Sequence, residues 1–126
     1  MKRFLLAILI LAILPSLVDA KRLHYEKWYQ QKWCKEKNGQ IEVVLSDRTR
    51  VDCLTSTHAI EFDFGNKWAE SIGQALHYAI QTEKKGGIVL ILEKTKDYKY
   101  WIRLNTIIQH FNLPIDSWMM GGGVPK

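Results

Sequence analysis

The chain has 126 residues, of which 18 are Lys or Arg and 13 are Asp or Glu, so its formal net charge is +5. This length suffices for one small domain and excludes two, and no internal repeat, low-complexity tract or Pro/Gly-rich linker divides the sequence. The basic excess is modest, so it fits a nucleic acid, an anionic membrane surface or no charged partner.

The first 20 residues have the pattern of a secretory signal peptide. Lys2 and Arg3 precede an apolar run over residues 4–14, and Ala20 is the expected last residue before cleavage. The run is too short for a stable transmembrane span, and no later segment would stop transfer, so the mature chain is expected to have no transmembrane helix. An uncleaved N-terminal anchor is the alternative. Either way we expect the chain to be exported, to the periplasm or beyond the cell.

The rest is predicted to be one domain over residues 21–120, followed by a flexible tail at 121–126. Residues 23–37 are predicted to form a helix that ends at Asn38-Gly39. Aromatic side chains recur along it with helical spacing, which favours packing in the core over a base-stacking platform. They are Tyr25, Trp28, Tyr29 and Trp33.

Two cysteines follow the expected cleavage site, Cys34 on this helix and Cys53 on a later strand. Export makes a disulfide between them permissible. A bridge that closes a loop of about 20 residues is worth roughly 3 kcal/mol in the chain-entropy model. Two buried free thiols are the alternative.

Three strands are predicted next, at residues 40–45, 50–54 and 58–64. Strict alternation places Glu61 and Asp63 on one face of the third strand, and Asp52 on the face of the second strand opposite to Cys53.

The turn between the second and third strands sets how these acids pair. If Ser56-Thr57 is a two-residue hairpin loop, Asp52 lies opposite Glu61, and Arg50 lies opposite Asp63. The first two carboxylates would then be about 5 Å apart at Cβ. Because like charges so close repel, a divalent cation is the usual remedy, and ligands that are all oxygen suit Mg²⁺ or Mn²⁺.

A helix follows through Gly65-Asn66, and its polar residues share one face. Their spacing of four, three and four residues predicts a stripe that faces the carboxylates, made of Lys67, Ser71, Gln74 and Tyr78.

The remaining elements complete an α/β chain. Residues 84–87 are expected to break the chain before a strand at 88–92 that is buried on both faces. A second amphipathic helix at 97–111 and an edge strand at 113–119 follow. The order α, β, β, β, α, β, α, β predicts a mixed sheet flanked by helices on both faces.

With this order, residues 26–93 resemble the PD-(D/E)XK nuclease superfamily, nearest its RecB-like branch. The resemblance rests on Asp52, Glu61 and the Gln74-x-x-x-Tyr78 pair on the following helix. It implies a restriction-endonuclease-like αβββαβ core that cuts DNA phosphodiesters, with Mg²⁺ held by Asp52 and Glu61 and with Gln74 and Tyr78 lining the site. Glu26 matches an acidic residue that some members carry on the first helix.

Where the superfamily pattern has a lysine, two residues after the glutamate, this chain has Asp63. Lys67 substitutes for that lysine if the chain is similar to members whose lysine has moved to the neighbouring helix; otherwise it is a solvated charge near a helix start. Asp63 is then a third metal ligand or the partner of Arg50 across the strands.

Two functions follow. One is an exported, divalent-metal-dependent phosphodiesterase that acts on DNA or RNA, with Lys67 orienting the attacking water or stabilising developing charge. The other is a catalytically inactive periplasmic binding or interaction module on the same fold. His58 and His77 lie off the acidic face and the polar stripe, so we expect ordinary histidines at both positions. The sequence leaves the oligomeric state open.

Overall fold

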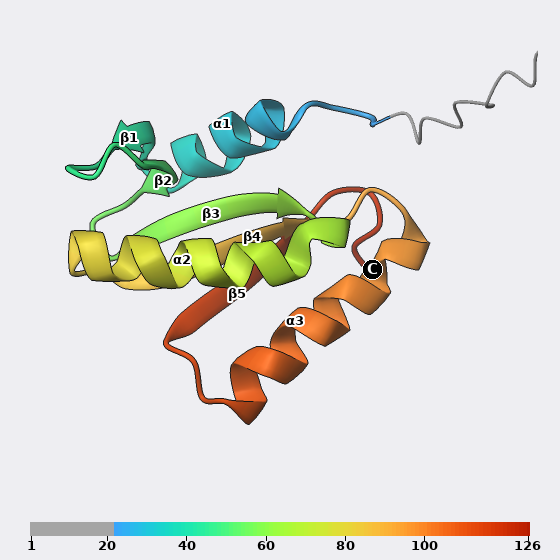
Figure 1. The fold of residues 1–126 in the computed structure, drawn as a ribbon. Helices are drawn as coiled ribbons and strands as arrows, with labels where there is room; N and C mark the ends of the chain where they lie inside the picture. Colours follow the sequence, from blue (N-terminus) through green and yellow to red (C-terminus); the bar gives the residue numbers. More distant parts are fainter. Residues whose placement is uncertain (1–21) are drawn as a thin grey trace, which may run out of the picture.

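The computed structural model describes residues 22–126, which form a mixed five-stranded sheet flanked by three α-helices (Figure 1). The expected signal peptide lies outside the described residues. The helices are α1 (Glu26–Glu36), α2 (Trp68–Thr82) and α3 (Tyr98–His110), and single 3-10 turns η1 (Gly65–Lys67) and η2 (Thr95–Asp97) precede α2 and α3. The strands are β1 (Gln40–Val44), β2 (Arg50–Leu54), β3 (His58–Phe64), β4 (Lys85–Ile91) and β5 (Ile115–Met120).

The strands lie side by side in chain order. The first three pair antiparallel, whereas β3, β4 and β5 are parallel and are joined through α2 and α3. β5 is an edge strand and begins directly after Pro114, because proline has no N–H to give to a ladder. The predicted α/β order, with a meander followed by helical crossovers, is confirmed.

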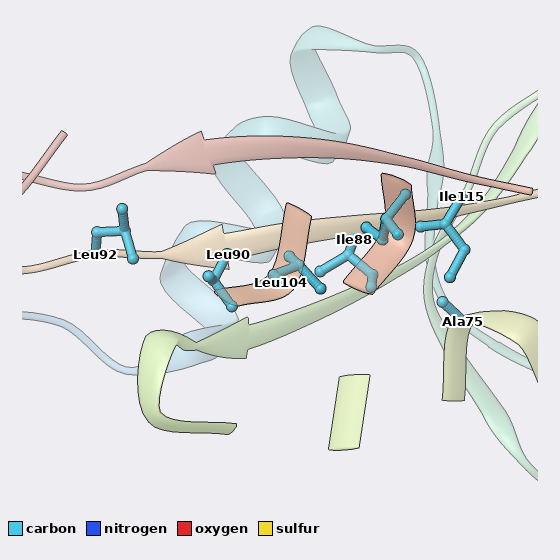
Figure 2. Close-up of a cluster of buried hydrophobic side chains, with 7 residues drawn as sticks. Ala75, Ile88, Leu90, Leu92, Leu104 and Ile115 are labelled. Carbon is cyan, nitrogen blue, oxygen red and sulfur yellow. The ribbon is translucent and has the colours of Figure 1, made fainter. Parts of the chain in front are cut away.

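The sheet is covered on both faces (Figure 1). Alternate residues of β4 point to opposite layers, so this strand is buried on both sides, as its apolar run predicts. On one face Ile88 and Leu90 pack under Leu104 of α3 and Ala75 of α2 (Figure 2). On the other face Val89 packs with residues of α1, β2 and β3: Cys34, Cys53, Ile60 and Phe62.

The Gly86-Gly87 pair lies inside β4, although it was expected to break the chain before that strand. A Cβ on Gly86 would lie 3.0 Å from the carbonyl oxygen of Ala75, and one on Gly87 would lie 2.9 Å from Ile60 Cγ1 and Trp118 Cζ3. Glycine is used here because α2 and two large side chains approach the strand backbone closely.

A disulfide joins Cys34 of α1 to Cys53 of β2, with 5.8 Å between their Cα atoms. The expected bridge is therefore present, and it fixes α1 against the sheet. The aromatic side chains of α1 assist: Tyr29 is buried, and Trp33 lies edge-on to Phe62. None of the helices in residues 22–126 is long and apolar enough to cross a membrane.

The last residues pack back onto the end of β4. The Gly123 N–H donates to the Leu92 carbonyl at 2.7 Å, and Gly123 is buried. Gly121 has φ of +110°, which glycine adopts without strain. The segment 121–126, expected to be a flexible tail, thus starts with a turn that is tied to the body of the domain.

Candidate active site

The site lies where β2 and β3 stop pairing. Their ladder pairs Cys53 with Ile60 and Leu54 with Ala59, which is the register expected from a Ser56-Thr57 loop. One step further, Asp52 Oδ2 accepts a hydrogen bond from the Phe62 N–H at 2.8 Å. The Asp52 side chain therefore accepts the Phe62 N–H that would have donated to the β2 backbone if the ladder had continued. The backbone ladder between β2 and β3 ends beside Glu61.

Two carboxylates of β3 are buried next to this point. Glu61 and Asp63 are each 6% exposed, and Asp52 is half-buried. Glu61 Oε2 and Asp63 Oδ2 are both buried without a hydrogen-bond partner in residues 22–126. A buried polar atom without a partner costs about 1–3 kcal/mol, and more when it is charged. The fold therefore keeps two oxygens in a state that a proton or a cation would relieve.

Burial and mutual repulsion raise the pKa of every acid in this group. The pKa of Glu61 is well above its usual range, because the group is desolvated and faces the charges of Asp52 and Asp63. Burial and the charge of Glu26 raise the pKa of Asp63 to about 7, and the charge of Lys67 opposes this rise. Desolvation likewise raises the pKa of Asp52 and of Glu26. Near neutral pH the cluster thus holds protons that isolated carboxyl groups would have lost.

α1 adds two polar side chains to the acids. Gln30 is 5% exposed, its Nε2 donates to Glu26 Oε1 at 3.0 Å, and its own Oε1 is buried without a partner. Burial, and after it the charge of Asp52, raises the pKa of Glu26 in the first turn of α1. Sequence reasoning named Glu26 and missed Gln30, although their spacing of four residues on one helix face is a signal for the pair.

The predicted stripe of α2 divides between the interior and the surface. Tyr78 is buried against Val51 and Ala59, and burial with the nearby charges of Glu61 and Asp52 raises its pKa to about 12. Ser71 is fully buried, and its hydroxyl donates to the Trp68 carbonyl within the helix. Gln74 is exposed, and its amide makes no hydrogen bond to any of the described acids.

Neither of the two expected basic partners forms an ion pair with the acids. Lys67 is exposed at the end of η1 and has no carboxylate within 4.0 Å among the described residues, although its charge lowers the pKa of Asp63. Arg50 Nη1 lies 3.9 Å from Glu42 Oε2 on β1 and does not pair with Asp63. The interpretation of Asp63 as the partner of Arg50 is therefore wrong, because the exposed guanidinium turns to the outer strand.

Within the part of the chain that the structure describes, no group of three or more His, Cys, Asp or Glu side chains is placed to hold a metal. A joint ligand set of Asp52, Glu61 and Asp63 is therefore not seen. The orphaned oxygens of Glu61 and Asp63 still fit a hard cation, because Mg²⁺ commonly takes only one or two carboxylates and keeps several waters.

No family model, curated protein or solved structure matches this chain.

Proposed function

We propose that the chain is an exported phosphodiesterase that cuts DNA or RNA with Mg²⁺ or Mn²⁺ on a restriction-endonuclease-like core. The observation that supports it best is the pair of buried, unpartnered oxygens of Glu61 and Asp63 beside Asp52, at the point where two strands part. Buried acids in a purely structural role are paired with cations or kept neutral by protons, and this cluster has no cationic side chain within ion-pair distance among residues 22–126.

In this proposal the protein's side chains hold the cation and position the attacking water. Asp52 is fixed by its bond to the Phe62 N–H, and Asp52 and Glu61 are the residues that would hold the cation. When bound, Mg²⁺ supplies stabilisation of the charge that develops on the phosphoryl oxygens. Glu61 and Asp63, whose pKa values are raised, would have to lose their protons to act as ligands. Lys67, at the exposed mouth, orients the attacking water or stabilises developing charge, and Tyr78 lines the site from α2.

The test is a nicking assay with supercoiled plasmid and a single-stranded RNA, in Mg²⁺ or Mn²⁺, on the mature chain. We expect Glu61→Ala to lower the rate by about 100-fold or more, because it removes a carboxylate that would hold the cation, and Lys67→Ala by about 10–100-fold, because it removes a positive charge beside the reacting phosphate. Glu36→Ala, which removes an exposed acid from the far end of α1, is the matched control and keeps full activity. Cutting that survives both substitutions belongs to a contaminant and rejects the proposal.

A second function, an inactive binding module on the same fold, is favoured by one observation. Lys67 forms no ion pair with the acids, so the lysine of the superfamily pattern has no substitute in direct contact with Glu61. In that case calorimetry detects Mg²⁺ binding that depends on Glu61, and the same preparation cuts neither DNA nor RNA.

A further inference from the structure

A buried carboxylate outside the acidic cluster holds the start of the described chain. Glu93, just after β4, is 9% exposed, and its Oε2 accepts hydrogen bonds from the backbone N–H groups of Leu23 at 2.8 Å and His24 at 3.3 Å. The Tyr29 hydroxyl donates to the same oxygen at 2.9 Å. Three donors on one buried oxygen fix this segment at the carboxyl end of the parallel strands.

Arg22 is thereby placed beside the candidate active site. Its guanidinium carbon lies 3.6 Å from the centre of the Phe64 ring, and its Nη2 donates to Asn66 Oδ1 at 3.1 Å. Phe64 ends β3 with its side chain on the face opposite to Asp63, and Asn66 precedes Lys67 in η1, so Arg22 is attached at the carboxyl end of the strand that carries the acids and next to Lys67. Its positive charge lowers the pKa of Glu26, which places it within electrostatic reach of the acids.

Much of the guanidinium is still available. The Arg22 side chain is 41% exposed, its contact with Glu93 Oε1 is long at 3.8 Å, and one of its five N–H groups is used by Asn66. A guanidinium that is stacked on an aromatic ring has already lost most of its rotamer freedom, so it binds a phosphate at little further entropic cost.

We propose that Arg22 binds a backbone phosphate of the nucleic acid next to the one that is cut, and that Glu93 positions it by fixing residues 22–24. The inference rests on the proposed function and adds a substrate-binding residue to it. Because the cluster is acidic, a nucleic acid needs a cation at its rim to approach, and Arg22 supplies a planar fork that matches phosphate oxygens.

The test is the affinity of the full mature chain for a fluorescent single-stranded DNA 12-mer, followed by anisotropy in EDTA, so that no cutting occurs. We expect Arg22→Ala to weaken binding about ten-fold and to lower the slope of log affinity against log salt by about one. Arg22→Lys keeps the charge, loses the fork and weakens binding about three-fold. Lys37→Ala is the control. Lys37 is also a cation that lies over an aromatic ring, that of Trp33, but at the opposite end of α1, so its removal should leave the affinity within two-fold.

Each outcome decides the matter. Equal affinity of the wild type and Arg22→Lys, with both folded by circular dichroism, overturns the inference even if Arg22→Ala fails to fold. A wild type that cuts with Mg²⁺ while Arg22→Ala binds and cuts normally leaves the proposed function standing and removes Arg22 from it. A wild type that binds through Arg22 but never cuts supports phosphate binding by Arg22 and rejects catalysis, and with it the position next to a phosphate that is cut. A wild type that does not bind the 12-mer rejects the inference, and the nicking assay with Mg²⁺ or Mn²⁺ then decides the proposed function separately.

Discussion

Asp63 is a buried acid whose ionisation works against folding. Its pKa is raised to about 7 in the folded chain, above the usual value of 3.8 for the free side chain. Between about pH 4 and pH 7 the folded chain therefore keeps a proton that the unfolded chain has lost. The stability from this group is complete at low pH and is lost as the pH rises through the folded pKa.

Asp63→Asn replaces the carboxyl group with an amide that does not ionise, so the variant does not lose this stability as the pH rises. We expect the variant to gain about 2 kcal/mol in the free energy of unfolding at pH 8 and to gain little at pH 4. Urea denaturation at the two pH values, without divalent cations, measures the difference. Asp47→Asn is the contrast: hydrogen bonds from Thr49 lower the pKa of Asp47 to about 2, so removing that carboxylate lowers stability at pH 8. Equal pH dependence in Asp63→Asn and the wild type would contradict the assignment.

Single residues were predicted from the sequence to different degrees. Strand alternation and the loop at Ser56-Thr57 place Asp52 opposite Glu61, because side-chain period and hairpin length fix a register. The partner of Arg50 could not be found in this way, since a long exposed side chain also reaches Glu42 on the other neighbouring strand. Glu93 gives no local signal either, because its donors lie about 70 residues away and meet it only in the folded chain.

At the scale of the elements, the sequence predicts the strands and helices well and the place of the glycines poorly. Asn38 ends α1 with φ of +53°, and local chemistry alone indicates this stop. Gly86 and Gly87 also resemble a stop, yet they serve packing inside β4. Gly86 and Gly87 are needed because residues distant in sequence pack against the β4 backbone. A local sequence pattern carries no information about such contacts.

Two glycine substitutions separate these cases. Gly87→Ala places a Cβ 2.9 Å from Ile60 and Trp118, and we expect it to destabilise the domain by about 1–3 kcal/mol through overpacking. Gly73→Ala, on α2 with nothing within 4 Å of the new Cβ, should stabilise by up to about 1 kcal/mol because alanine favours a helix. Thermal unfolding of both variants checks the signs, and a stable Gly87→Ala would mean that β4 and β5 repack freely.

At the scale of the whole molecule, the site joins elements that are far apart in sequence. β2 and β3 bring the acids, α1 brings Glu26 and Gln30, and the disulfide between Cys34 and Cys53 ties that helix to the residue next to Asp52. The sequence predicts this bridge as permissible, and only the approach of α1 to β2 shows that it forms.

Cation binding is expected to stabilise the whole domain in a pH-dependent way. Because protons must leave Glu61 and Asp63 first, 10 mM Mg²⁺ should raise the melting temperature by several degrees at pH 8 and by much less at pH 5. Differential scanning fluorimetry measures both shifts. The double variant Asp52→Asn/Glu61→Gln should show neither, and an undiminished shift in it would place the cation elsewhere.

Both ends of the described chain are hydrogen-bonded to consecutive residues, Leu92 through Gly123 and Glu93 through Leu23. A short peptide between them would close the chain into a ring, and new ends could then be opened in the exposed turn at residues 46–49 with the strand order intact. For the same reason an affinity tag or a fused domain joined directly before Arg22 or after Lys126 would lie close to the end of β4.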